Sequence, residues 1–170
     1  MILVGLGSNL AAPGYASPQQ TAAAALPALP ALGIRVIRRS RWYVSEPVPA
    51  SDQPWYVNAV AAVAAELDPP ALLEALLALE RRFGRRRGAP NAARTLDLDL
   101  LDYDGRRCAG ARLVLPHPRL HERRFVLAPL AEIAPEWRHP TLGLGVAELL
   151  RRLPPGQPVR ALGEQDTPDG

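Results

Sequence analysis

The sequence predicts an α+β protein, and three observations carry this prediction. Apolar stretches of strand character are bounded by glycine- and proline-rich turns. Two stretches of helical composition interrupt them, and the second has clear start and stop signals. The resulting order is strand, helix, strand, strand, helix, strand, at residues 2–6, 21–32, 33–48, 55–67, 69–83 and 94–101. This is the order of a split-βαβ sandwich, the ferredoxin-like fold.

The first strand and helix candidates lie at the start of the chain. Residues 2–6, ILVGL, are a short apolar run that ends in the turn signal GSN. The segment GLGSN at 5–9 matches neither the P-loop nor the dinucleotide-binding pattern. We expect it to form a tight turn from strand to helix, with its backbone or Asn9 near a ligand. The alanine-rich stretch 21–32 contains two prolines, so we expect its helix to end early or kink.

The next two segments are predicted to pair as strands. Apolar residues alternate through 33–48 as they do in a half-buried strand. The segment 55–67 is its expected partner, although its alanines leave strand and helix both open. The linker contains Pro47, Pro49 and Pro54, and it is therefore predicted to be a loop.

The central helix is the clearest element in the chain. Asp68 can cap its first turn, Pro69 suits the first helical position, and Gly84 follows the last turn. An apolar face at helical spacing is formed by Leu72, Leu76, Leu79 and Phe83. We therefore expect a helix over 69–83 that packs one face on the sheet.

The remaining elements follow the strand at 94–101. A short strand and a loop are expected over 111–124, and helices are expected at 125–133 and 146–153. We expect helices on one face of the sheet, with the further C-terminal helices and loops at its edges. The chain is thus predicted to be one domain, 1–153, followed by a flexible segment, 154–170, rich in proline, glycine and polar residues.

Composition limits the classes of protein that fit this chain. It has 170 residues, of which 48% are hydrophobic, enough for one buried core. It contains no run of about 20 apolar residues, its start lacks a basic signal-peptide region, and Cys108 is its one cysteine. We therefore expect a cytoplasmic protein with no membrane contact, no disulfide and no structural zinc site.

All 20 lysine-plus-arginine positions are arginine, and the formal net charge is +3. One explanation is the base composition of the genome, because alanine and proline are also abundant. The other is phosphate binding, which guanidinium groups perform bidentately. A net charge this small does not require a nucleic-acid partner, and we expect none.

The stretch RTLDLDLL at 94–101 carries the strongest chemical signal. Leu96, Leu98 and Leu100 occupy one parity. Asp97 and Asp99 occupy the other, so on a strand both carboxylates leave one face, roughly 7 Å apart. One interpretation is a solvated polar face. A calcium loop beginning at Leu100 is excluded because its closing position is Ala111 instead of glutamate. The third interpretation is a magnesium pair, since Mg²⁺ is held by one or two carboxylates together with substrate phosphates.

Arginines surround this stretch in the sequence. Arg94 begins it, and Arg85, Arg86 and Arg87 lie in the preceding loop, 84–93. The triplet can be a solvated helix end that interacts favourably with the helix dipole. Combined with the carboxylates, the arginines favour a site for Mg²⁺ and a triphosphate, with a loop that can close over the nucleotide.

A second basic cluster follows in the loop LPHPRLHERRF at 115–125. It is composed of His117, Arg119, His121, Arg123 and Arg124. Each histidine can be an ordinary exposed loop residue. The combination of imidazole and guanidinium groups favours a second phosphate-binding edge.

The chain resembles the 6-hydroxymethyl-7,8-dihydropterin pyrophosphokinases in four segments, which occur in the order and spacing of that family. They are GLGSNL at 5–10, SDQPWYVNAV at 51–60, RTLDLDLL at 94–101 and LPHPRLHERRFVLAPLAEIAPEW at 115–137. The similarity extends from residue 2 to about residue 153. It implies an ATP- and Mg²⁺-dependent enzyme of folate biosynthesis that moves the β,γ-diphosphate of ATP onto the pterin hydroxymethyl group and releases AMP.

The resemblance also implies roles for residues around the nucleotide. Asp97 and Asp99 would hold two Mg²⁺ ions that bridge the ATP phosphates. Phosphate oxygens would be contacted by Arg94, His117 and Arg123. Arg85 and Arg87 match arginines of a mobile catalytic loop, and Glu80 matches a position close to the nucleotide.

Five residues are similar to those that bind the pterin in this family. The ring would stack between Tyr56 and Phe125, and Asn58 would hydrogen-bond to it. The loop around Ser45 and Val48 would supply backbone groups to its polar edge. These residue types suit the ligand, because a flat polar heterocycle needs aromatic faces and a fixed amide.

The chain departs from the family pattern in the loop before RTLDLD. Position 90 is proline where the family has arginine, and the loop is one residue shorter than in longer members. Of the roles implied by the family resemblance, those of Arg85, Arg86 and Arg87 therefore carry over to this chain least directly.

Two other functions remain open from the residues alone. A ferredoxin-like RNA-binding module would have aromatic RNP strands, but aromatic residues are only 5% and no such stretch is present. A Mg²⁺-dependent nucleotidyl transferase would share the aspartate pair and differ in its product. For the favoured function we expect a monomer whose small-molecule substrates are ATP and 6-hydroxymethyl-7,8-dihydropterin.

Overall fold

A computed structural model of the chain describes residues 1–85, 88 and 92–163. Within these residues, a six-stranded sheet is combined with four α-helices and a separate two-stranded sheet. The strands of the large sheet are β1 (Ile2–Ser8), β2 (Ile34–Arg39), β3 (Tyr43–Ser45), β4 (Tyr56–Ala65), β5 (Asp97–Tyr103) and β8 (Val159–Ala161). The helices are α1 (Pro18–Ala25), α2 (Pro69–Arg82), α3 (Arg124–Ile133) and α4 (Val146–Arg152). The small sheet pairs β6 (Cys108–Ala109) with β7 (Val114–Leu115).

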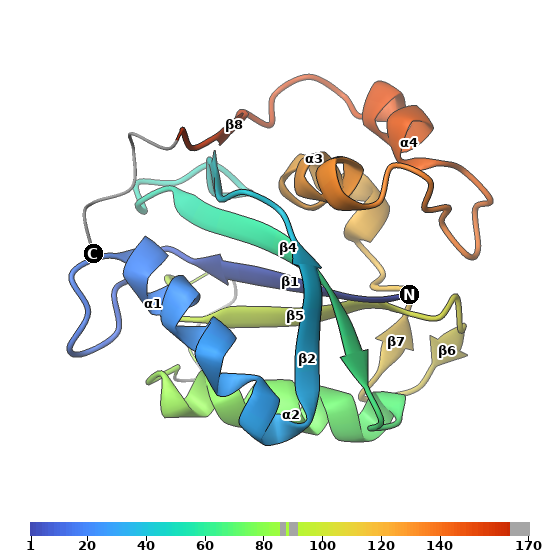
Figure 1. Cartoon of the computed structure of the whole chain (residues 1–170). Helices are drawn as coiled ribbons and strands as arrows, with labels where there is room; N and C mark the ends of the chain where they lie inside the picture. The colour runs from blue at the N-terminus through green and yellow to red at the C-terminus, as the bar shows by residue number, and fades with distance from the viewer. Residues whose placement is uncertain (86–87, 89–91, 164–170) are drawn as a thin grey trace.

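The large sheet is antiparallel, with the order β5-β1-β4-β3-β8, and β2 also pairs with β4. The chain runs from β1 through α1 to β2 and β3, and from β4 through α2 to β5. These are the two halves of the split-βαβ arrangement, and β1 lies between the strands of the second half. The predicted α+β, ferredoxin-like class is confirmed (Figure 1).

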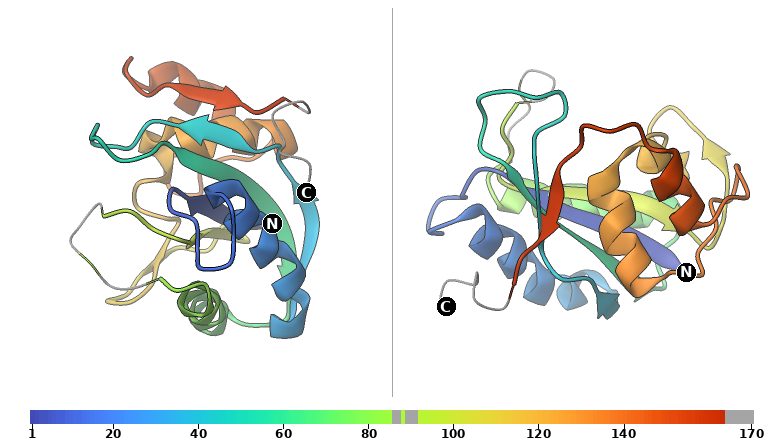
Figure 2. Two further views of the ribbon diagram at one scale, coloured as in Figure 1. Left: turned by 90° about the vertical axis from the view of Figure 1, so that its left-hand side faces the viewer. Right: turned by 90° about the horizontal axis from the view of Figure 1, so that it is seen from above.

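Helices cover both faces of the sheet. α1 and α2 lie on one face, and α3 and α4 lie on the other (Figure 2). The expectation that the C-terminal helices lie at the sheet edges is therefore wrong. α3 buries Leu127 and Leu130 in one cluster with Leu3, Val60 and Leu101 of the sheet. A second helical layer is needed because β1 is apolar on both of its faces, and each face must be removed from water.

The central helix begins and ends where the sequence predicts. The Asp68 carboxylate accepts the Ala71 N–H at 2.9 Å, Pro69 occupies the first position, and Gly84 adopts a left-handed conformation (φ 80°) after the last turn. At 14 residues α2 is the longest of the described helices, and none of them is both long and apolar enough to cross a membrane.

Elsewhere in the first half, prolines and packing set the boundaries. α1 begins at residue 18, earlier than expected, and ends at residue 25, where two short 3₁₀ turns, Leu26–Ala28 and Pro30–Leu32, replace it. The segment 33–48 forms two strands instead of one. The ambiguity over 55–67 is resolved in favour of a strand, because β4 lies inside the sheet between two helical layers, where alanine is small enough to pack.

The segment after 153 contains structure that the sequence analysis did not predict. Residues 159–161 form the edge strand β8, which pairs antiparallel with β3. Backbone pairing supplies the order that the polar, proline-rich composition does not indicate. The boundary of the domain at 153 stays a prediction, and residues 164–170 lie outside the described part of the chain.

Candidate functional site

Asp97 and Asp99 begin β5 and leave the sheet on the side that carries α3. Leu98 and Leu100 point to the opposite side and are buried in the core beneath α1 and α2. The aspartate side chains keep 19% and 30% of their accessible surface, so both can reach a ligand. The strand alternation that the sequence predicts is thus present in the structure.

A β-bulge changes the parity of β5 after the aspartates. β1 pairs with Leu100 and then with Asp102, so that Leu101 is the extra residue. Asp102 is consequently buried on the α3 side, where it accepts the Trp137 indole N–H at 2.8 Å. Asp97 and Asp99, before the bulge, are therefore accessible, whereas Asp102, after it, is buried in the core.

Arginines contact both accessible carboxylates. Arg85 donates to one oxygen of Asp97 at 2.8 Å, and Arg94 donates to the other at 3.2 Å. The Arg123 guanidinium lies 4.0 Å from Asp99. Burial, together with the nearby charge of Asp97, raises the pKa of Asp99 to about 7. The pair therefore sits in a site that favours added positive charge.

Glu80 reaches this site from α2 and is buried. One of its carboxylate oxygens accepts the Leu98 N–H at 2.8 Å and also a hydrogen bond from Arg85. Burial raises the pKa of Glu80 to about 7, against the opposing effects of these two partners. Arg85 is therefore shared between Glu80 and Asp97, and it joins the end of α2 to the start of β5.

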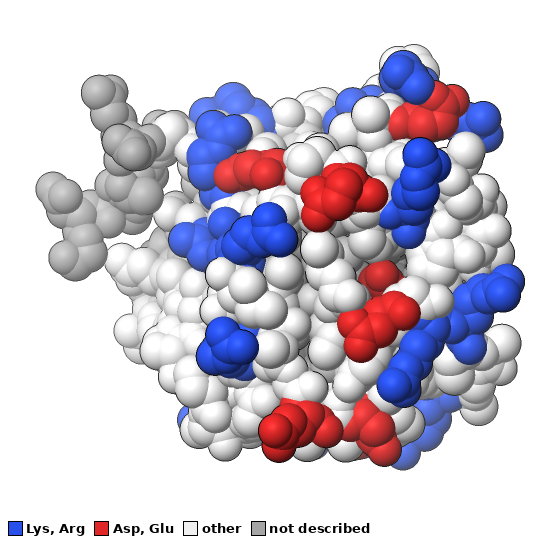
Figure 3. Space-filling model, turned by 45° about the vertical axis from the view of Figure 1, so that its right-hand side comes forward, with Lys and Arg blue, Asp and Glu red and all other residues white. Residues whose placement is uncertain are grey.

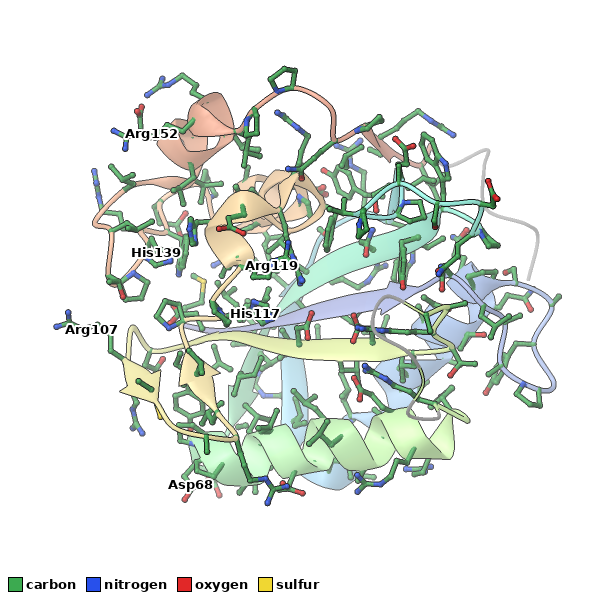
Figure 4. All side chains as sticks on the ribbon, turned by 180° about the vertical axis from the view of Figure 1, so that it is seen from behind. Asp68, Arg107, His117, Arg119, His139 and Arg152 are labelled. Carbon is green, nitrogen blue, oxygen red and sulfur yellow. The ribbon has the colours of Figure 1, made fainter. Side chains whose placement is uncertain are left out.

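His117 lies near the Asp97/Asp99 end of the site, on the loop between β7 and α3. Figure 4 shows His117 and Arg119 between the β5 side of the sheet and α3. Burial and the nearby charge of Arg123 lower the pKa of His117 to about 4, so its ring is neutral at neutral pH. Its Nδ1 accepts the Arg119 N–H at 3.2 Å, which leaves the ring proton on Nε2.

The first of two hollows beside the aspartates has a volume of about 310 Å³. We call it the loop-side hollow, because much of its wall is the loop between β3 and β4. It is lined by all five residues expected at the pterin, Ser45, Val48, Tyr56, Asn58 and Phe125. Arg94, Asp97 and Arg123 complete one side of it. The Asn58 amide donates to the Ser45 hydroxyl at 2.6 Å, which fixes its orientation.

The second hollow, also of about 310 Å³, lies between α2, β5 and the loop before α3, and we call it the helix-side hollow. Its polar lining is Glu80, Arg85, Arg94, Asp97, Asp99, Arg112 and His117. Leucines of α2 and β5 supply apolar surface. Asp97 and Arg94 line both hollows, so the two meet at this pair.

Gly5 and Gly7 of β1 line a small hollow together with Asn58, Asp97 and Asp99. Gly7 pairs with Asn58 on β4 and with Asp97 on β5, and a Cβ at Gly7 would lie only 3.0 Å from the Asn58 amide oxygen. The expectation that GLGSN forms a turn is wrong for both glycines, which lie inside β1. Glycine in a strand permits close approach of another group, which explains its use here.

Asn9 follows β1 and connects two walls of the site. Its side-chain oxygen accepts the Arg94 N–H at 2.8 Å, while its amide donates to Gln53 and to the Pro54 carbonyl. The residue is 1% exposed. Asn9 thereby ties the loop of the loop-side hollow to the segment that leads into β5.

The carboxylates alone do not make a metal cage. Within the described residues, no three histidine, cysteine or acidic side chains converge as a metal-binding group. Asp97 and Asp99 instead suit an ion that takes its remaining ligands from substrate and water, as Mg²⁺ does. Figure 3 shows another face of the molecule, where arginine and acidic side chains are interspersed.

Comparison with known families supplies the decisive observation. Residues 3–135 match the model of the family described as 7,8-dihydro-6-hydroxymethylpterin-pyrophosphokinase. The chain belongs to this family. It is accordingly an ATP-dependent diphosphotransferase of folate biosynthesis, which moves the diphosphate of ATP to the hydroxymethyl group of the dihydropterin and leaves AMP.

Individual relatives of the pyrophosphokinase family agree with this assignment. A Synechocystis protein named 2-amino-4-hydroxy-6-hydroxymethyldihydropteridine pyrophosphokinase is 44% identical over 89% of this chain and 75% of its own length. A Pseudomonas aeruginosa protein of the same name is 42% identical over 90% of this chain and 91% of its own. Among solved structures, HPPK-DHPS of Plasmodium falciparum superposes with a TM-score of 0.61 at 13% identity. The match covers 88% of this chain and 42% of that longer one, and it supports the fold alone.

Some residues of the pyrophosphokinase site were not assigned by sequence reasoning. Gly7 could have been found, because a glycine inside an apolar strand signals close approach. Gln53 lines the loop-side hollow and lies in a quoted motif, while Arg112 lines the helix-side hollow and had no signal. Of the predicted loop arginines, Arg85 is placed at Asp97, whereas Arg86 and Arg87 lie outside the described residues.

Proposed function

We propose that the pterin binds in the loop-side hollow and the nucleotide in the helix-side hollow, and that the diphosphate is transferred where they meet. The observation that carries this proposal is that Asp97 and Arg94 line both hollows. A transfer between two bound substrates requires their reacting atoms to be held together and in line. Two hollows with a shared charged wall provide such an arrangement.

The proposed pterin contacts follow from the lining of the loop-side hollow. Tyr56 and Phe125 supply aromatic faces for a flat ring. The Asn58 amide, held by Ser45, supplies hydrogen bonds of fixed direction, and the backbone around Val48 supplies further ones. Burial raises the pKa of Tyr56, so its hydroxyl stays protonated.

The proposed phosphate contacts are cationic or neutral donors. In the transfer, the pterin hydroxyl oxygen forms a bond to the β-phosphorus, the bond from that phosphorus to the α,β-bridging oxygen breaks, and AMP leaves while the hydroxyl proton is released. Arg94 and Arg123 offset the charge on the moving diphosphate, and neutral His117 donates its Nε2 proton. Arg85 and Arg87 are proposed to act from the loop after α2, and Glu80 to hold Arg85.

We further propose that Asp97 and Asp99 hold two Mg²⁺ ions together with the ATP phosphates. Bound metal would supply positive charge to the phosphate oxygens. The donor set supports this, because two partly exposed carboxylates lie among cationic groups, whereas the neighbouring Glu80 carboxylate is buried and bonded to the Leu98 N–H and to Arg85. Calorimetric titration of Mg²⁺ with a non-hydrolysable ATP analogue tests it without turnover: Asp97→Asn should weaken Mg²⁺-dependent binding, and equal binding would contradict it.

The activity is tested by incubating the chain with ATP, Mg²⁺ and the dihydropterin and separating the nucleotides. AMP should form in step with pterin loss, and only when both Mg²⁺ and pterin are present. ADP would indicate transfer of a single phosphoryl group. Release of inorganic pyrophosphate would indicate nucleotidyl transfer, and either result would contradict the proposal.

Three broader properties are part of the same proposal. We propose that residues 1–153 form the catalytic domain, that the enzyme acts as a monomer, and that it works in the cytoplasm. Both hollows are lined entirely by residues before 126 of this one chain, so 1–153 contains every lining residue and no second subunit is needed to complete either hollow. Sedimentation of the chain at assay concentration checks the monomer, and a dimeric species would contradict it.

A further inference from the structure

The segment between α4 and the edge of the sheet contacts the start of α3 and then pairs with β3. Residues 157–162, which we call the C-terminal strap, include β8, which lies alongside β3 in Figure 2. The strap lies beyond residue 135, where the family match ends. Its contacts join β3 to the start of α3, and both contribute lining residues to the loop-side hollow.

One end of the strap holds the start of α3 through Gln157. The Gln157 carboxamide oxygen accepts the Arg124 N–H at 2.9 Å, and its amide donates to the Glu122 carbonyl at 2.9 Å. These two backbone groups flank Arg123. The first N–H groups of a helix need external acceptors, and Arg123 at the N-cap position provides no side-chain acceptor, so Gln157 caps α3 from outside.

The other end of the strap holds β3. Glu46 donates its N–H to the Pro158 carbonyl at 3.3 Å, Val159 pairs with Ser45, and Leu162 donates to the Trp42 carbonyl at 2.8 Å. Ser45 in turn accepts the Asn58 amide. The wall that carries Ser45 and the helix start that carries Arg123 are therefore tied to one short segment.

The two hydrogen bonds of Gln157 restrain the backbone on both sides of Arg123, and the Arg123 side chain reaches the site. Its guanidinium lies 4.0 Å from Asp99 and 5.4 Å from the centre of the Phe125 ring. A long side chain can reach many positions, so fixing its backbone narrows where its guanidinium can lie; the Arg123 side chain is partly buried, with 23% of its surface accessible. A carboxamide that bonds to the backbone on both sides of Arg123 supplies that fixation.

We propose that Gln157 is a positioning residue for diphosphate transfer: by clamping the backbone around Arg123, it places the guanidinium between Asp99 and the loop-side hollow. This inference rests on the phosphate-binding role proposed above for Arg123. Small displacements of a charge-stabilising group lower the rate strongly, so the loss of the clamp should lower kcat/KM for ATP about tenfold.

The first test compares Gln157→Ala with Gln20→Ala in the full chain. Gln20 is a matched control, because its carboxamide also accepts a backbone N–H, that of Ala16, at the start of α1. Gln157→Ala loses two glutamine–backbone bonds and Gln20→Ala loses one, so thermal melts of both variants accompany the kinetics, and rates are corrected for the folded fraction. Only Gln157→Ala should lower kcat/KM for ATP; equal kinetics in the two variants would overturn the proposal.

The second test asks whether Gln157 acts through Arg123. In an Arg123→Ala background, Gln157→Ala should cause no further loss of kcat/KM, since the group that it positions is absent. A further tenfold loss there would overturn the inference. If Arg123→Ala itself keeps normal activity, the proposed role of Arg123 fails instead, so the two failures are distinct.

A third variant keeps the test decisive if Gln157→Ala folds poorly. Gln157→Glu retains an acceptor for the Arg124 N–H but has no donor for the Glu122 carbonyl. It should therefore show an intermediate loss of kcat/KM. Activity equal to that of the unchanged chain would show that the second half of the clamp has no kinetic role and would overturn the proposal as stated.

Discussion

The two faces of the large sheet are built by the same strands, but one forms a closed core and the other carries the site. On the face beneath α1 and α2, Leu98 and Leu100 of β5 join a closed apolar core. On the opposite face, the alternating residues are Asp97 and Asp99, and β1 contributes glycine to their surroundings. α3 covers part of this second face and leaves the end with the aspartates open. A site therefore forms where the second helical layer stops, and strand alternation lets its polar residues coexist with a core one residue away.

The largest expected effect comes from the open face. Asp97→Asn and Asp99→Asn should each lower kcat at least about a thousandfold, because a lost metal contact removes several kcal/mol of transition-state stabilisation. The thermal unfolding temperature should change little, since neither side chain belongs to the core. Initial rates of AMP formation and a thermal melt measure the two quantities. If either variant kept near-normal turnover, that aspartate would not be needed for the reaction, and the open face would not differ from the closed face in this respect.

The neighbouring residue on the closed face should behave in the opposite way. Leu98→Ala should lower the free energy of unfolding by about 2–5 kcal/mol, because it leaves a cavity in a packed core. The folded fraction should retain most of its kcat at low temperature. Urea unfolding, together with rates corrected for the folded fraction, checks this expectation, and a large loss of kcat with unchanged stability would contradict it.

Replacing Glu80 tests the contact between α2, which covers the closed face, and the site. Its pKa of about 7 in the folded chain exceeds the ordinary value of 4.5, so the unfolded chain ionises first. The contribution of Glu80 to stability is then highest below about pH 4.5 and falls by at most about 3 kcal/mol as the pH rises through 7. Glu80→Gln keeps an acceptor for the Leu98 N–H and should show a smaller fall, since the raised pKa of Asp99 still contributes in the same pH range. Urea unfolding at several pH values measures it; parallel profiles for the two proteins would contradict the expectation.

The smallest effect compares two glycines on the open face. A methyl group at Gly7 would lie 3.0 Å from the Asn58 oxygen, whereas one at Gly5 would meet Leu101 at an ordinary 3.5 Å. Gly7→Ala should therefore raise KM for the pterin about tenfold by displacing Asn58, with kcat less affected. Gly5→Ala is the matched control and should leave that KM within about twofold. Equal effects of the two changes would argue against a ligand-facing role for Gly7.

Much of this protein could be predicted from local pattern. The helix over 69–83 carries its own cap, first-turn proline and terminal glycine, so its limits follow from short-range chemistry. The outward parity of Asp97 and Asp99 follows from strand geometry alone. The resemblance to one family, carried by four motif segments, added the five pterin-side residues, all of which line one hollow.

Other features depend on partners that are distant in the sequence. The helices after 124 lie on the second face because β1 is apolar on both sides, a consequence of where β1 sits between β4 and β5. The strand β8 forms because β3 offers an edge, although its own composition favours disorder. The bulge at Leu101 turns Asp102 inward, which no periodicity in RTLDLDLLDYDG could indicate.

Which residues can do the chemistry follows from the amino-acid sequence, because residue type, strand parity and helix capping act over a few positions. Which of these residues meet follows from the packing of distant segments. Arg85, Arg94 and Arg123 come from three segments and converge on two carboxylates, and Gln157 reaches the start of α3 from a segment that had no assigned role. The physical reason is that such contacts are set by the packing of layers and by sheet order, which join residues far apart in the chain.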